Sequence, residues 1–186
     1  MTISPRTFLG MSFAMAVFVL VAGPITAQDE DAHPFSIHDM LAMQRIGEPT
    51  VSPDGESIAF SLRTTDFEKN GGATDIWITG IDGQDLRQLT IDPASDFNPL
   101  WTPDSDAILF LSTRSGSSQV WKVGTEAGAS PTQITDLPLD LSNLILSRDA
   151  EKIAFSLEVF PDANSPEATK ARLDAIEADP ATGMIY

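Results

Sequence analysis

The stretch that decides the fold is TVSPDGESIAF, residues 50–60. It recurs twice, as LWTPDSDAILF at residues 100–110 and as ILSRDAEKIAF at residues 145–155. The aspartates matched in this way lie 50 and 45 residues apart, at Asp54, Asp104 and Asp149. An internal period of about 45 residues is typical of four-stranded propeller blades.

Each copy predicts a tight turn followed by a strand. In the first copy Pro53 fixes φ at the second turn position, and Gly55 accepts the positive φ that follows. The second copy keeps Pro103 but has no glycine, and the third copy loses both residues, so its turn is predicted to be degenerate. The strands expected after the turns are residues 57–62, 107–112 and 152–157.

A second motif has the same period, because QLT at residues 88–90 recurs as QIT at residues 133–135. The chain is therefore predicted to be all-β, with about 2–3 four-stranded blades of a partial β-propeller over residues 49–160. A single blade cannot bury both faces of its sheet, so neighbouring blades must stack.

The bulky and repeated side chains are interpreted as architecture. We expect the tryptophans to fill the space between blades, at Trp77, Trp101 and Trp121. The repeated turn residues lie a whole blade apart, which argues against a metal site and favours a role in the turns. They are Pro53, Asp54, Gly55, Pro103, Asp104 and Asp149.

The segments at both ends differ from the repeats. Residues 1–27 are predicted to be a secretory signal peptide, with a basic residue before a short apolar run and a small residue at the expected cleavage site. The alternative is that the segment is kept as an uncleaved anchor. Residues 161–186 are predicted to be a helical insertion, running from a Ser165 cap to about Ala178, and then the start of a further strand that reaches Tyr186.

Residues 28–48 form a lead-in segment with a short helix. Ser36 caps this helix, and Asp39 three residues later completes a capping-box pattern. We expect the helix to end near Arg45, because a glycine and a proline follow.

Composition excludes several functional classes. The 186 residues carry 11 Lys+Arg against 27 Asp+Glu, a formal net charge of -16, and phosphate binding needs the opposite sign. There is no cysteine, which excludes disulfides, zinc–thiolate sites, iron–sulfur clusters and cysteine nucleophiles. With only two histidines, His33 and His38, we predict no metal and no cofactor.

The order of these features resembles a known family. A helix over residues 35–41, the Ser-Pro-Asp-Gly turn at 52–55, Ile76-Trp77, Leu89-Thr90 and the Pro-Asp turn at 103–104 are similar to the N-terminal β-propeller of bacterial exported prolyl-oligopeptidase-family serine peptidases. These are the dipeptidyl- or acylaminoacyl-peptidase-like members, and the resemblance covers essentially all of residues 35–186. The resemblance implies a propeller that gates a C-terminal α/β-hydrolase domain, which carries Ser, Asp and His and hydrolyses short peptides.

The catalytic part of that pattern is missing. The chain contains no Gly-x-Ser-x-Gly elbow, and both histidines precede every propeller serine. We therefore assign no catalytic residue and expect the chain alone to be inert. It is interpreted as a fragment, because residues 49–160 amount to about two and a half blades and closure takes at least four.

The resemblance also implies partners and a location. The expected partners are the missing hydrolase domain and an oligopeptide substrate, with neither nucleic acid nor, after signal cleavage, a membrane. The expected location is periplasmic or extracellular. Two alternatives stay open: a TolB-like periplasmic protein-binding propeller, which reuses the Pro-Asp-Gly repeats, and a short β-sandwich-like protein whose repeats pair differently.

Overall fold

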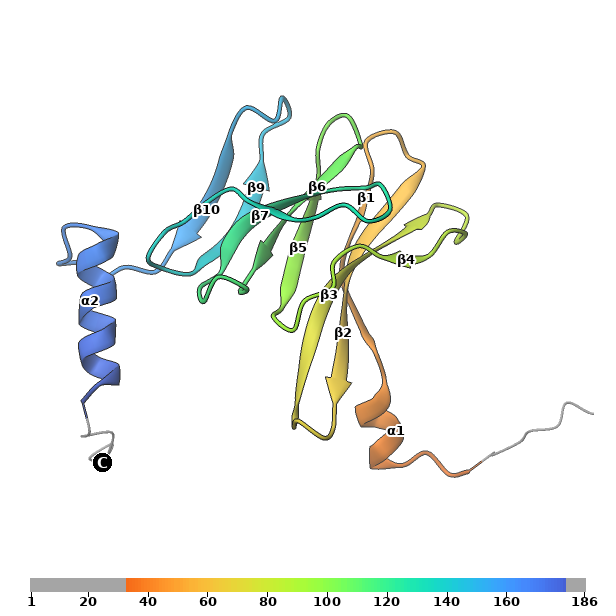
Figure 1. The fold of residues 1–186 in the computed structure, drawn as a ribbon, viewed down its shortest axis with the longest axis horizontal. Coiled ribbons are helices and arrows are strands. Elements are labelled where there is room, and N and C mark those ends of the chain that lie inside the picture. Colours follow the sequence, from red (N-terminus) through yellow and green to blue (C-terminus); the bar gives the residue numbers. More distant parts are fainter. Residues whose placement is uncertain (1–32, 180–186) are drawn as a thin grey trace, which may run out of the picture. The chain divides into compact units, whose positions relative to one another are not determined.

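Three antiparallel sheets and two helices make up the chain in a computed structural model, which describes residues 33–179 (Figure 1). The expected signal peptide and the expected strand at the last residues lie outside the described part. Residues 35–179 belong to one unit.

Two of the sheets have four strands and the same topology. The first is ordered β1 (Arg45–Val51), β2 (Ser57–Asp66), β3 (Gly71–Gly80), β4 (Arg87–Gln88). The second is ordered β5 (Asp96–Trp101), β6 (Ala107–Ser112), β7 (Gln119–Gly124), β8 (Thr132–Gln133). The third has two strands, β9 (Leu141–Leu146) and β10 (Ile153–Leu157). This mostly-β arrangement confirms the predicted partial propeller.

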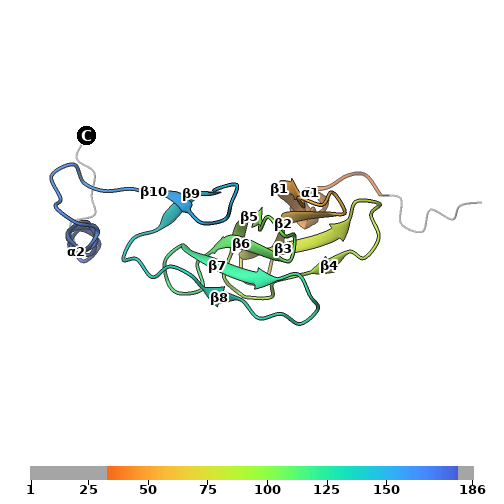
Figure 2. The ribbon, with the colours of Figure 1, turned by 90° about the horizontal axis from the view of Figure 1, so that it is seen from above.

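The sheets stack side by side, with the second between the other two (Figures 1 and 2). Alternate residues of β6 serve its two faces. Ile108 and Phe110 join a core against the first sheet, while Leu109 and Leu111 join a second core against β9. All six residues of β6 are buried, so this strand is the centre of the packing.

Helix α1 (Ile37–Ala42) is shorter than expected. Its capping box is present, since Asp39 N donates to Ser36 Oγ (3.3 Å) and Ser36 N donates to the Asp39 carboxylate (2.6 Å). The prediction that it ends near Arg45 is wrong, because Met43 is already extended. The first strand, β1, starts at Arg45, four residues before the residue 49 at which the blades were expected to begin. The proline that suggested a helix stop, Pro49, instead lies in β1, where an edge strand tolerates its missing N–H.

Helix α2 (Pro166–Glu177) agrees with the sequence prediction, with Ser165 as its cap. It is anchored to the segment that precedes it. Phe160 N donates to Thr169 Oγ1 (3.4 Å), and the Arg172 guanidinium lies 4.1 Å from the centre of the Phe160 ring. In the order of elements along the chain, α2 follows β9 and β10, whereas a third strand follows the first two strands of each four-stranded sheet.

Candidate functional site

The first Pro-Asp turn is held by its own backbone and side chains. Gly55 N donates to Ser52 O (2.9 Å), and Gly55 has a φ of +77°. The Asp54 carboxylate accepts from Ser52 Oγ (2.5 Å) and from Glu56 N (3.0 Å). These hydrogen bonds lower the pKa of Asp54, and the bond from Ser52 has the largest effect.

The third turn has the same geometry without proline or glycine. Ala150 N donates to Ser147 O (2.9 Å) at a φ of +55°. The Asp149 carboxylate accepts from Ser147 Oγ (2.6 Å) and Glu151 N (3.1 Å). The serine and aspartate are thus sufficient for the turn, and the sequence-based expectation of a degenerate third copy does not extend to its backbone.

The second turn has the same backbone hydrogen bond but begins with Thr102 and has Ser105 at the position with positive φ. Ser105 N donates to Thr102 O (3.0 Å) at a φ of +61°. A hydrogen bond with the Thr102 side chain lowers the pKa of Asp104. The Ser105 hydroxyl also accepts from Asp54 N (3.2 Å), so the first two turns are in contact.

The three tryptophans are not equivalent. Trp101 is 8% exposed, and its Nε1 donates to Thr50 O (3.1 Å), which joins the first two sheets. Trp121 packs against the same core from β7. Trp77 alternates with Ile76 and Ile78, which face the second sheet, so it lies on the face of the first sheet that no described sheet covers.

A second repeated feature escaped the sequence analysis. Glu48, Asn98 and Asn143 have φ values of 52°, 55° and 54° and lie at the register shifts of β1, β5 and β9. Their spacing equals that of the turn aspartates. The Glu48 carboxylate accepts from Asn98 N (2.6 Å), which links β1 to β5. The signal in the sequence was a proline after Glu48 and after Asn98, three residues before the first residue of the turn that follows.

The first strands of the three sheets, β1, β5 and β9, lie next to one another. β1 lies against β5, and β5 lies against β9. Where these strands run into the Pro-Asp turns, they surround a hollow of about 560 Å³. Most of its lining is apolar, and Arg148 is the one cation among the described residues that line it; the side chains include Val51, Pro53, Trp101, Pro103, Ile145 and Arg148.

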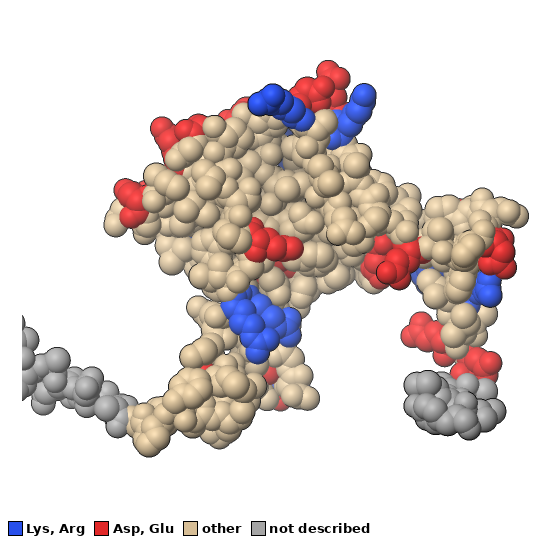
Figure 3. All heavy atoms as spheres, turned by 180° about the vertical axis from the view of Figure 1, so that it is seen from behind, with Lys and Arg blue, Asp and Glu red and all other residues tan. Residues whose placement is uncertain are grey.

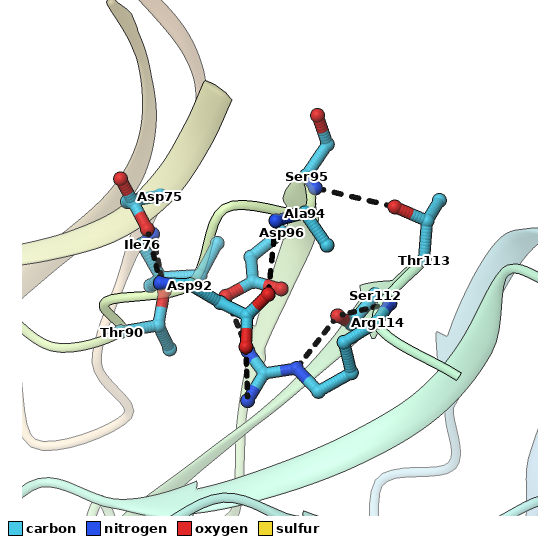
Figure 4. Close-up of polar contacts among 10 residues, drawn as sticks. All are labelled: Asp75, Ile76, Thr90, Asp92, Ala94, Ser95, Asp96, Ser112, Thr113 and Arg114. Atoms are coloured by element: carbon cyan, nitrogen blue, oxygen red, sulfur yellow. Dashed lines mark hydrogen bonds and ion pairs between the residues drawn. The ribbon is translucent and has the colours of Figure 1, made fainter. Parts of the chain in front are cut away.

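A buried ion pair lies at the opposite end of the strands (Figure 4). Arg114 Nη2 is 2.6 Å from Asp96 Oδ2, and the Asp96 side chain is 0% exposed. Arg114 Nε donates to Ser112 Oγ (2.9 Å), and the guanidinium lies 4.9 Å from the centre of the Trp121 ring. Among the described residues, Asp96 Oδ1 has no hydrogen-bond partner.

The same cluster reaches the first sheet through Asp75. Burial, followed by the charge of the nearby carboxylates Asp96 and Asp92, raises the pKa of Asp75. Asp92 N donates to Asp75 Oδ1 (3.4 Å) in the link between the sheets. The carboxylates of this cluster bind one guanidinium and backbone N–H groups, and these contacts hold the two sheets together.

The described residues carry little other chemistry. In residues 33–179, no three His, Cys, Asp or Glu side chains are grouped to hold a metal ion. No helix of this part is long and apolar enough to cross a membrane. On the face shown in Figure 3, Asp and Glu side chains are spread in separate groups instead of one patch.

Stacked antiparallel sheets whose first strands share one wall define part of a β-propeller. Within that class, the TolB beta propeller domain family (PD40) matches residues 41–159, and the chain belongs to this family.

Individual relatives extend the comparison. The chain is 23% identical to dipeptidyl-peptidase 5 of Porphyromonas endodontalis over 97% of its own length, and spans 27% of that protein. It is 44% identical to the Tol-Pal system protein TolB of Anaeromyxobacter dehalogenans over 50 residues, which are 27% of this chain and 10% of that protein. The AtxE2 isopeptidase has the same fold, with a TM-score of 0.59 at 19% identity over 84% of this chain and 27% of that one. The expected similarity to the propeller part of peptidases is confirmed.

Proposed function

We propose that the chain is a non-catalytic, substrate-gating propeller segment of an exported serine peptidase that hydrolyses short peptides. The observation that carries this proposal is the match to dipeptidyl-peptidase 5 over 97% of the chain but only 27% of that protein. The hollow beside β1, β5 and β9 supports a route for small peptides, because its lining combines apolar side chains with one cation.

In this proposal the chemistry is supplied by an α/β-hydrolase domain elsewhere in a longer protein. The propeller limits which peptides reach that domain, and Pro53, Asp54, Gly55, Pro103, Asp104 and Asp149 keep its turns in shape. Export through a signal peptide at residues 1–27 would deliver the protein to the periplasm or the outside of the cell.

An activity assay tests the division of labour. The purified chain is incubated with aminoacyl and dipeptidyl chromogenic substrates, and we expect no turnover. Turnover that a serine-directed fluorophosphonate abolishes would overturn the proposal. The second measurement is the coding sequence downstream of Tyr186: an open frame with a Gly-x-Ser-x-Gly elbow, followed by Asp and His, supports the peptidase.

The second candidate is a TolB-like protein-binding propeller in the periplasm. The 44% identity to TolB over 50 residues favours it. This candidate predicts that the downstream frame adds further blades and then stops, without a nucleophile elbow. It also predicts that the complete protein, purified from its host envelope, retains a protein partner after crosslinking and has no peptidase activity.

A further inference from the structure

The third turn, Ser147-Arg148-Asp149-Ala150, carries an unexplained substitution. Where the first two copies have Pro53 and Pro103, the third has Arg148. The turn keeps its hydrogen bonds without the proline, because Ser147 and Asp149 make them. The arginine is therefore not required by the fold, and its position becomes informative.

Arg148 lies on the rim of the 560 Å³ hollow. The two prolines at the equivalent positions lie on the same rim, and the wall between them is formed by apolar side chains such as Val51, Trp101 and Ile145. Arg148 is exposed, and the described part of the chain contains no ion pair to it. An exposed cation beside an apolar surface is suited to a ligand with an apolar body and an anionic end.

Among the described residues, the nearby carboxylates form no ion pair with this cation. Asp54 and Asp149 accept hydrogen bonds within their own turns, from a serine hydroxyl and a backbone N–H in each case. Their lowered pKa values keep them ionised, so they repel a ligand carboxylate placed over the turns. The favourable place for an anion is then next to the guanidinium, on the side of the hollow.

We propose that this hollow binds the C-terminal end of a short peptide, with an apolar last side chain against Trp101 and the free carboxylate on Arg148. The choice of a peptide as ligand rests on the proposed function. The carboxylate preference rests on charge complementarity with the Arg148 guanidinium, the one cation among the described residues that line the hollow.

The test compares two probes on the full chain: N-acetyl-Ala-Ala-Phe with a free carboxylate, and the same peptide as its C-terminal amide. Binding is followed by NMR through the indole N–H of Trp101, which lies in the wall of the hollow. For an exposed arginine we expect the acid to bind about threefold more tightly than the amide. The Trp77 indole, on another face, serves as an internal control.

Matched variants locate the charge. Arg148→Gln is expected to remove the preference for the acid, and Arg148→Lys to keep most of it. Lys152→Gln removes the same charge from the end of the same turn but outside the lining of the hollow, and is expected to keep the preference. Circular dichroism confirms that each variant is folded.

Three outcomes overturn the proposal: no acid preference in the parent chain, an unchanged preference in Arg148→Gln, or an equal loss in Lys152→Gln. Failure here is distinct from failure of the proposed function. If the complete protein hydrolyses peptides while the hollow ignores the carboxylate, only this inference is lost. If the acid preference is found and no peptidase activity exists, the binding site stands and the gating role is lost.

Discussion

Backbone conformation at single residues carries much of the turn geometry. Gly55 and Ala150 occupy equivalent positions at φ +77° and +55°, and a Cβ on Gly55 would meet no atom within 4 Å. A left-handed conformation costs an alanine about 1 kcal/mol relative to glycine. We expect Gly55→Ala to lower the free energy of unfolding by about that amount and Ala150→Gly to raise it. Urea titration measures both, and shifts of the same sign would contradict this reasoning.

Asp75 gives a pH dependence of defined sign. Its pKa is raised above the ordinary value of 3.8, so the folded state binds this proton more tightly than the unfolded state does. The stability that it contributes is present below pH 3.8 and is lost as the pH rises through the raised pKa. Asp75→Asn should therefore stabilise the protein at pH 7 and change little at about pH 3. A stabilisation that grows toward acid pH would refute the assignment.

Asp149 is the matched control with the opposite sign. Hydrogen bonds from Ser147 and Glu151 lower its pKa, so its contribution is present above the ordinary value and is lost as the pH falls. Asp149→Asn should destabilise the protein at neutral pH, and the difference from the parent should shrink in acid. The two variants are compared by thermal unfolding across the same pH series.

At the level of elements, the Asp96–Arg114 pair fastens the link between the first two sheets to the end of β6. Removing one partner leaves a buried charge unpaired, which costs about 3 kcal/mol. We expect Arg114→Ala and Asp96→Ala each to lower the stability by about that amount, and the double variant by less than the sum. Denaturant unfolding of the four proteins measures the coupling, and additive effects would show that the pair is not a unit.

Elements were predictable where their signals are local. The strand β6 matches its prediction at both ends, because turn residues flank a short apolar run. Helix α2 was visible from Ser165-Pro166, since a cap and a first-turn proline belong to one short stretch. The early end of α1 could not be predicted in this way. Gly47 and Pro49, which suggested a later helix end, lie at a bulge that forms only when β1 pairs with β2.

The residues of the candidate site also fall into those with local sequence signals and those without. The turn aspartates could be found because they bond residues within their own turn. The left-handed residues Glu48, Asn98 and Asn143 depend on strand register, and the Asp96–Arg114 pair joins residues 18 positions apart. The left-handed residues share the period of the turns, but their conformation depends on bulges that form only when the strands pair, and the ion pair occurs in one sheet alone among the described residues, so local sequence patterns do not reveal either.

For the whole molecule, the second sheet is the common member of two cores. Phe110 belongs to the core against the first sheet, and Leu111 belongs to the core against β9. We expect Phe110→Ala and Leu111→Ala each to cost about 3 kcal/mol, with different consequences for local opening. Hydrogen exchange should show lost protection in β2 and β3 for the first variant, and in β9 and β10 for the second. Identical exchange patterns in both would mean that the three sheets open as one unit.

The way in which the third turn is held affects which positions of repeated segments can change in sequence. Ser147 and Asp149 hold the turn, so the residue between them is free to change without unfolding the blade. Positions of this kind stand side by side around the rim, one from each copy. New chemistry can therefore be acquired there one copy at a time at little cost in stability, so that a repetitive scaffold can evolve an asymmetric surface.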